Sequence, residues 1–168
     1  MRNAPAKFGR LARLYCWMEY FSFGLYLQQC RMLRLAQIAW RKRALVYGDG
    51  DGRFVAELAR RVPTLRIAAV DASPEMLRET ARRLSPEAQV RLVQADALDC
   101  NVASFPEVPF DLIVTHFFLD CFEEAELALL LSRVNAAVEE NARWVVSDFA
   151  IPHRNPARFM GILIVRGL

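Results

Sequence analysis

The sequence predicts an α/β protein in which helices cover both faces of a mainly parallel sheet, a three-layer α/β/α arrangement. Short apolar runs typical of buried strands alternate with stretches of helical periodicity, and a glycine-rich turn joins the first strand to the first helix. With 168 residues, 54% of them hydrophobic and 24% charged, the chain suits one globular domain. We divide it into an N-terminal helical cap, residues 1–43, and a globular α/β unit, residues 44–168.

The glycine turn follows an apolar run at residues 44–47. Gly48, Gly50 and Gly52 alternate with other residues, and the apolar positions after them recur at helical spacing. A turn of this kind places backbone N–H groups and a helix N-terminus at the carboxyl end of a parallel strand, where open α/β sheets bind their ligands. The turn is therefore the first candidate site.

The residues between the glycines indicate what the turn binds. A dinucleotide turn has the pattern G-x-G-x-x-G/A, and here the third small position falls on Arg53. The spacers Asp49 and Asp51 would repel a pyrophosphate, and no Gly-Lys-Ser/Thr follows as in a P-loop. A cationic ligand without phosphate, such as S-adenosylmethionine, is favoured over NAD(P) or a nucleoside triphosphate.

Charge is divided unevenly along the chain. The net charge is +3, but residues 1–43 hold nine basic residues and one acid, whereas the remainder holds 13 basic and 18 acidic residues. The basic arm either marks an anionic partner or membrane surface, or is a solvated helix face that docks on the acidic body. Its aromatic residues form either part of the core or a lid over a ligand.

The cysteines and histidines do not indicate a metal site. The four cysteines lack a C-x-x-C spacing and the chain has two histidines, so we expect no metal and reduced thiols in a cytoplasmic protein. No uninterrupted apolar run approaches the roughly 20 residues of a membrane helix. We therefore expect no transmembrane segment.

Acidic residues follow the next two predicted strands, residues 65–70 and 90–93. Asp71 lies roughly 20 residues past the turn, where a carboxylate can accept both ribose hydroxyls of a nucleoside. The other role for Asp71, an N-cap, suits Ser73 before Pro74 better. Asp96 is either a turn residue or an acceptor for the adenine amine, and its neighbours favour the second interpretation.

The second half of the chain continues the alternation. Residues 110–115 form a continuous apolar stretch, typical of a strand buried on both faces, and it ends at His116. We expect a helix over residues 123–138 that ends by Asn141, a fifth strand at 143–148 and a final helix at 157–165.

Together, the Gly48-x-Gly50-x-Gly52 turn, Asp71, Asp96 and strand 110–114 resemble the Rossmann-like, class I S-adenosylmethionine-dependent methyltransferases, over residues 44–152. The resemblance implies that the turn holds the methionine part of the cofactor, Asp71 the ribose, and Asp96 with the Ala97 N–H the adenine. The cofactor-binding residues it implies are Tyr47, Gly48, Asp49, Gly50, Gly52, Asp71, Ala72, Met76, Asp96, Ala97 and Thr115.

Two departures from this family stand out. The family usually has an acid two residues before the first glycine, and here that position is Val46. The family sheet normally has seven strands, whereas this chain is expected to be truncated after strand five. Strand five would then be an exposed edge unless the final helix or a second subunit covers it, so a homodimer is one expectation.

Methyl transfer from a sulfonium mainly requires donor and acceptor to be held in near-attack geometry. We predict His116 as the base when the acceptor must lose a proton, oriented by Asp120 four residues later; otherwise His116 is a polar turn residue. Aromatic residues near the site suggest a small, apolar or aromatic acceptor. The alternatives are a cofactor-binding protein without turnover and, less favoured, a nicotinamide oxidoreductase, and nucleic acid is not expected as the acceptor.

Overall fold

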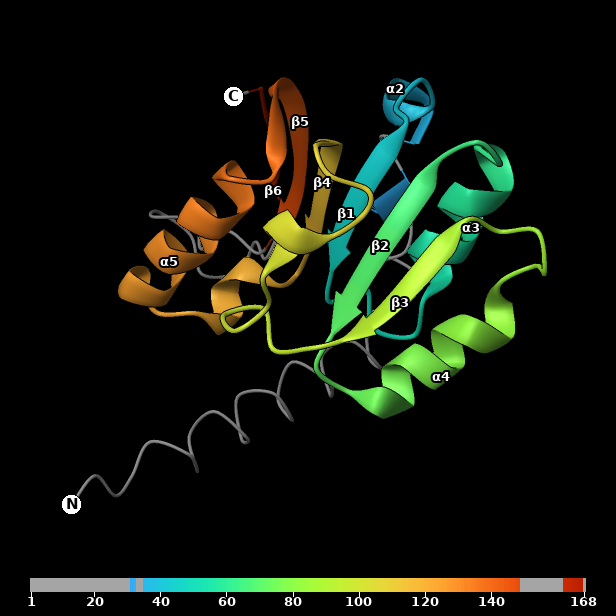
Figure 1. The fold of residues 1–168 in the computed structure, drawn as a ribbon, viewed down its shortest axis with the longest axis horizontal. Coiled ribbons are helices and arrows are strands. Elements are labelled where there is room, and N and C mark those ends of the chain that lie inside the picture. Colours follow the sequence, from blue (N-terminus) through green and yellow to red (C-terminus); the bar gives the residue numbers. More distant parts are fainter. Residues whose placement is uncertain (1–30, 33–34, 149–161, 168) are drawn as a thin grey trace, which may run out of the picture.

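The computed structural model describes residues 31, 32, 35–148 and 162–167 of the chain. They form a six-stranded sheet of order β3-β2-β1-β4-β5-β6, in which β1 to β5 are parallel and β6 is antiparallel to β5 (Figure 1). The strands are β1 Arg43–Tyr47, β2 Arg66–Asp71, β3 Val90–Gln94, β4 Phe110–His116, β5 Val138–Asp148 and β6 Ile162–Gly167. The chain order reverses beside β1, so β1 and β4 flank the switch point where open α/β sheets bind ligands.

Helices cover the two faces of the sheet, which confirms the predicted three-layer fold. The helices are α2 Leu35–Ile38, α3 Arg53–Arg61, α4 Pro74–Arg83 and α5 Glu124–Asn135, with short 3₁₀ turns η1 Val102–Ser104 and η2 Leu119–Cys121. Successive side chains of β1 point to opposite faces. Val46 packs into the core under α3, whereas Tyr47 packs into the core under α5.

The predicted boundary between α5 and β5 is wrong by several residues. The expected helix 123–138 ends at Asn135, and β5 begins at Val138 instead of residue 143. Phe110 at the start of β4 pairs with Val138, and the Phe110 N–H donates to the Ala137 oxygen at 2.8 Å. Pairing with β4 therefore decides the conformation of this segment, because a strand partner far away in sequence outweighs local helix propensity.

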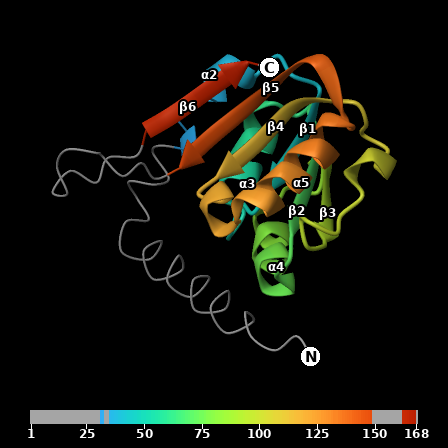
Figure 2. The ribbon, with the colours of Figure 1, turned by 90° about the vertical axis from the view of Figure 1, so that its left-hand side faces the viewer.

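The predicted end of the sheet is also wrong. Residues 162–167, part of which was expected to be helical, form β6, which lies along β5 (Figure 2). The sheet is thus not truncated after strand five, and the β5 edge that motivated a homodimer is paired within the chain. The apolar run at 162–165 is rich in β-branched residues, which suits a strand as well as a helix.

A carboxylate between the strands fixes the register of β1 against β4. The buried Asp111 side chain accepts the backbone N–H groups of Lys42 and Arg43, at 2.9 and 2.8 Å. Tyr47 pairs with Thr115 at the other end of the ladder. The glycine turn is consequently set beside the end of β4.

The predicted N-terminal cap falls mostly outside the described residues. The apolar periodicity of this cap predicts helices at residues 8–21 and 25–39 with a break at Gly24. Residues 8–30 lie outside the described part of the chain, whereas α2 lies within the second predicted helix. Within the described part of the chain, no helix has both the length and the apolar character needed to cross a membrane.

Candidate cofactor site at the carboxyl edge of the sheet

The glycine turn after β1 has a backbone that only glycine adopts readily. Gly48, Gly50 and Gly52 have φ values of 58°, 66° and 79°. Two of them also lack room for a side chain: a Cβ on Gly48 would lie 2.4 Å from the Phe118 ring, and one on Gly52 would lie 2.3 Å from Thr80 Oγ1. Gly52 therefore lets α4 approach the start of α3.

Asp49 is buried inside this turn. It is 6% exposed, and its Oδ2 accepts the N–H of Val55 at 2.9 Å, so it caps α3, whose N-cap Gly52 has no side chain to do so. Its Oδ1 is buried and has no hydrogen-bond partner among the described residues. Burial raises the pKa of Asp49 to about 7, and the nearby positive charge of Arg31 opposes this.

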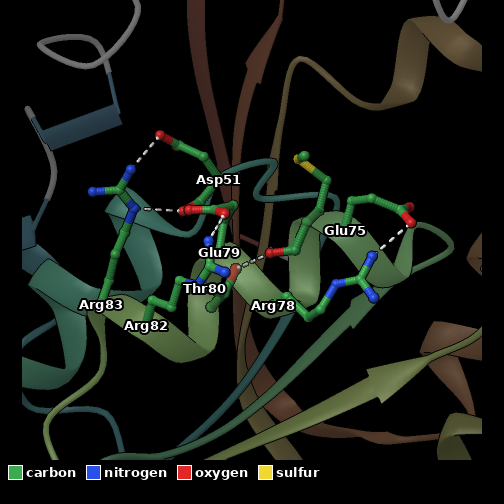
Figure 3. A network of polar contacts seen from close by, with 8 residues as sticks. Asp51, Glu75, Arg78, Glu79, Thr80, Arg82 and Arg83 are labelled. Carbon is green, nitrogen blue, oxygen red and sulfur yellow. Dashed lines mark hydrogen bonds and ion pairs between the residues drawn. The ribbon is translucent and has the colours of Figure 1, made fainter.

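Asp51, the second acid of the turn, binds arginines of its own chain. Its carboxylate pairs with Arg53 at 2.7 Å and with Arg83 at 3.0 Å. Arg83 Nε also donates to the Asp51 backbone oxygen at 2.8 Å, and Figure 3 shows both contacts of Arg83 with Asp51. The prediction that both turn acids attract a cation is therefore wrong for Asp51. Asp51 is balanced by two guanidinium groups, and Asp49 is the acid that faces the interior of the turn.

Asp71 and Asp96 lie where the sequence predicted them, after β2 and β3. Asp71 Oδ1 accepts the Ser73 N–H at 2.8 Å, and Ser73 is the N-cap of α4, as predicted. Asp96 is exposed, and its Oδ1 accepts the Leu98 N–H at 2.9 Å. In each aspartate, one carboxylate oxygen accepts a backbone N–H group of its own turn. This hydrogen bond fixes the direction of the carboxylate at this edge of the sheet.

The other predicted cofactor residues divide into two groups. Ala72 and Met76 are half-buried beside Asp71, and Met76 N–H donates to Ser73 Oγ at 3.3 Å. Tyr47, Ala97 and Thr115 are buried in the core on the α5 side or within β4. Thr115 Oγ1 accepts the Trp144 indole N–H at 2.9 Å, so its hydroxyl binds β5 rather than facing the turn.

His116 is the last residue of β4 and is 2% exposed. Its Nδ1 lies 2.8 Å from Ser147 Oγ, and the Phe54 ring contacts it edge-on at a centroid distance of 4.6 Å. Burial, and then the charge of Arg31, lower the pKa of His116 to about 3. The imidazole is therefore neutral at pH 7.

Asp120 does not orient His116, contrary to the sequence prediction. It is exposed in η2, where Cys121 Sγ donates to its Oδ1 at 3.7 Å, and the His116 ring is held by Ser147 of the neighbouring strand. A spacing of four residues brings two side chains together only on a helix. Here His116 is in a strand and Asp120 is in the turn that follows it.

Aromatic residues lie just past β4, next to His116 in the chain. Phe117 has a φ of 53°, a left-handed value that is uncommon outside glycine, and the Arg31 guanidinium lies 5.7 Å from its ring centroid. Phe118 stacks on Tyr47 at 5.7 Å and contacts Phe122 edge-on at 5.0 Å. Strained backbone of this kind concentrates at functional sites.

These residues fit an S-adenosylmethionine molecule in two respects. The unpartnered Asp49 oxygen lies in the turn where a cationic group would satisfy it. Two further carboxylates stand at the ends of β2 and β3, where the ribose and adenine of a nucleoside would be held. The residues that would hold the cofactor are thus those of the turn with Asp71 and Asp96.

The sheet order and the helices on both of its faces define a Rossmann-like α/β protein. A sequence profile described as "Methyltransferase domain" matches residues 44–141. The chain belongs to this methyltransferase-domain family, as the sequence predicted.

Individual relatives agree with this family. An uncharacterised methyltransferase of Mycobacterium tuberculosis is 33% identical over 105 residues, which are 62% of this chain and 49% of that protein. A release factor glutamine methyltransferase of Chlorobaculum tepidum is 36% identical over 91 residues, 52% of this chain and 30% of that protein. The chain thus spans about half or less of the curated relatives it matches.

Solved structures show the same fold. The N-methyltransferase NodS from Bradyrhizobium japonicum, in complex with S-adenosyl-L-homocysteine, superimposes with a TM-score of 0.60 at 19% identity over 72% of this chain and 61% of that one. The S-adenosylmethionine-dependent methyltransferase SibL superimposes with a TM-score of 0.62 at 26% identity, over 78% of this chain and 39% of that one.

Proposed function

We propose that this chain transfers a methyl group from S-adenosylmethionine to a small, apolar or aromatic acceptor by direct in-line displacement. The observation that carries the proposal is the carboxyl edge of the sheet, where a turn of three left-handed glycines after β1 stands beside Asp71 and Asp96 after β2 and β3. The family and the similar structures support it.

Each residue of the site has a definite task in this proposal. The cofactor supplies a methyl group already activated by the sulfonium. The turn and Asp49 position its cationic methionine end, while Asp71 accepts hydrogen bonds from the ribose and Asp96 from the adenine. The protein thus contributes mainly orientation, because an activated carbon needs little further polarisation.

The acceptor would lie at the end of β4. Phe118 and Phe122 contact each other edge-on there, and Phe117 follows His116, the last residue of the strand. Such a surface favours an apolar or aromatic molecule. We propose His116 and Asp120 as acceptor-side residues.

We also propose that the reaction takes place in the cytoplasm, where the free thiols of Cys100 and Cys121 would remain reduced.

A second candidate function is cofactor binding without turnover. The observation that favours it is Val46, a buried apolar residue where the family usually has an acid before the first glycine. A cofactor held less firmly would bind without reaching the in-line geometry that transfer requires.

Calorimetric titration with S-adenosylmethionine and S-adenosylhomocysteine tests the proposal. We expect micromolar dissociation constants, about −8 kcal/mol. Asp71→Ala should abolish the binding or weaken it at least about tenfold, a loss of about 1.4 kcal/mol. The control is Asp99→Ala, an exposed aspartate in the turn after β3. Equal affinities for both variants, or no binding by the intact chain, would contradict the cofactor assignment.

Transfer of a labelled methyl group to a panel of phenols, carboxylic acids, thiols and amines separates the two functions. Transfer to any member supports the enzyme. Tight cofactor binding with no transfer to any of them supports the second candidate, and tight binding of NAD(P)H, measured by its fluorescence, would contradict both.

A further inference from the structure

A buried serine and a buried histidine face each other across the last register pair of β4 and β5. His116 and Ser147 are each 2% exposed, they are partners in the strand ladder, and His116 Nδ1 lies 2.8 Å from Ser147 Oγ. The Ser147 backbone oxygen also accepts the Phe117 N–H at 2.6 Å. Ser147 therefore fixes both the His116 ring and the chain that follows it.

The donors and acceptors of the His116 ring and the Ser147 hydroxyl indicate which ring nitrogen carries the hydrogen. The neutral imidazole has one donor and one acceptor nitrogen. If Nδ1 donated to Ser147 Oγ, the serine hydroxyl hydrogen would have no acceptor, because its one partner among the described residues is His116, and Nε2 would also be unpaired. If the hydroxyl donates to Nδ1, one group is unpaired instead of two. The second arrangement is favoured, since unpaired buried polar groups are unfavourable.

We propose that Ser147 is a positioning residue that holds His116 in the tautomer with hydrogen on Nε2, so that His116 donates a hydrogen bond to an oxygen atom of the methyl acceptor. This inference rests on the proposed function, because it concerns the acceptor side of the same site. In this tautomer His116 is not the general base that the sequence predicted, because an Nε2 atom that already carries a hydrogen cannot take a proton from the acceptor.

The observation that points to a ligand is the Nε2 atom itself. It is buried and has no hydrogen-bond partner among the described residues. The Phe54 ring contacts one side of the imidazole. Since no described residue supplies an acceptor for this buried donor, we assign its partner to a ligand oxygen at the end of β4.

The positive charge of Arg31 indicates what kind of ligand oxygen binds the His116 Nε2–H group. The Arg31 side chain is 3% exposed, and its guanidinium lies 5.7 Å from the ring centroid of Phe117, the residue after His116. Its positive charge lowers the pKa of His116 and opposes the rise in the pKa of Asp49. A guanidinium beside an N–H donor favours an oxygen that carries negative charge, as in a carboxylate or phenolate. Asp49 is the acid of the turn that faces the same guanidinium. The inferred acceptor is therefore an oxygen-bearing aromatic molecule rather than a hydrocarbon or an alkyl thiol.

The tautomer is measured on the full chain with nitrogen-15-labelled histidine. The sequence has two histidines, so His153→Gln leaves His116 as the single imidazole signal. Long-range proton–nitrogen spectra are expected to show hydrogen on Nε2 and none on Nδ1, unchanged from about pH 5 to about pH 8. Hydrogen on Nδ1, or a titration within this range, would overturn the proposal.

The role of Ser147 is tested by a matched pair of variants in the same background. Ser147→Ala removes the hydroxyl and is expected to give a mixture of the two tautomers, whereas Ser147→Thr keeps the hydroxyl and should restore the single form. A general loss of packing does not by itself exchange one tautomer for the other. If Ser147→Ala keeps the Nε2 form alone, Ser147 is not the positioning residue.

The ligand is tested with benzoate and toluene added to protein saturated with S-adenosylhomocysteine. Benzoate should move the His116 Nε2–H resonance downfield and bind about fivefold more weakly to Ser147→Ala, a loss of about 1 kcal/mol. Toluene should leave the resonance in place. Bound benzoate that leaves it unmoved would overturn the ligand assignment. Failure to bind S-adenosylhomocysteine contradicts the proposed function instead, because the tautomer of the free protein does not depend on it.

Discussion

Arg83, the last residue of α4, binds Asp51 of the glycine turn at two points. Its Nε donates to the Asp51 backbone oxygen at 2.8 Å, and its Nη2 lies 3.0 Å from the carboxylate (Figure 3). The turn follows β1 and α4 follows β2, so this pair joins the segments that carry two parts of the candidate cofactor site.

Replacing Arg83 by alanine should loosen the glycine turn. We expect a loss of about 1 kcal/mol in the free energy of unfolding, because the pair is partly exposed, and an affinity for S-adenosylhomocysteine that falls a few-fold. Urea unfolding and calorimetry measure the two effects. The control is Arg82→Ala, whose arginine pairs with Glu79 inside the same helix. Equal losses in both variants would show that Arg83 does not order the turn.

A side chain at Gly52 should destabilise the fold. In Gly52→Ala the new Cβ would lie 2.3 Å from Thr80 Oγ1 and 2.5 Å from the backbone of Thr80, at a φ of 79°. The left-handed backbone costs about 1–2 kcal/mol and the overlap about 1–3 kcal/mol, which thermal unfolding would detect. Adding Thr80→Ala should not rescue the variant, because the overlap with the backbone of residue 80 remains. Full rescue would show that the steric overlap involves only the Thr80 side chain and not its backbone.

Two buried groups should make stability depend on pH in opposite directions. Burial lowers the pKa of His116 to about 3, so between about pH 3 and its ordinary value near 6.5 the unfolded chain binds more protons and stability rises with pH. In Asp49→Asn this contribution is no longer opposed by that of Asp49. We expect its free energy of unfolding to increase by roughly 3 kcal/mol from about pH 4 to about pH 6.5, measured by urea unfolding. A flat profile would contradict the burial of a neutral imidazole.

The reverse variant isolates Asp49. Burial raises the pKa of Asp49 from 3.8 to about 7, so in this window the folded chain binds more protons and stability falls as pH rises. In His116→Gln we therefore expect the free energy of unfolding to decrease by roughly 3 kcal/mol from about pH 4 to about pH 7. In the unaltered chain the contributions of His116 and Asp49 oppose each other and largely cancel. A rise with pH in His116→Gln would contradict this account.

The local part of the fold and site could be predicted from the sequence. The glycine turn, the Ser73 N-cap before Pro74 and the acids after β2 and β3 lie as expected, because each depends on residues within a few positions of one another. The positive φ values follow from the glycines themselves.

The contacts that could not be predicted join residues far apart in the chain. His116 meets Ser147 because β4 and β5 are paired in one register, and Gly52 meets Thr80 because α3 and α4 pack closely. The β6 strand exists because β5 offers an edge. A short apolar run such as residues 162–165 is compatible with a helix and with a strand, so hydrophobic periodicity alone did not distinguish the two structures.

Asp111 offers the most direct test of how the sheet positions the site. Its carboxylate accepts the N–H groups of Lys42 and Arg43 and is 7% exposed, so Asp111→Ala would leave two backbone donors without their acceptor at the start of β1. We expect a loss of about 2–4 kcal/mol in the free energy of unfolding, and a smaller loss in Asp111→Asn, which keeps one acceptor oxygen. The control is Glu139→Ala, which removes the less buried ion-pair partner of Arg43 on β5. If Asp111→Ala loses no more than Glu139→Ala, the register of β1 against β4 is set by packing of the core and not by this carboxylate.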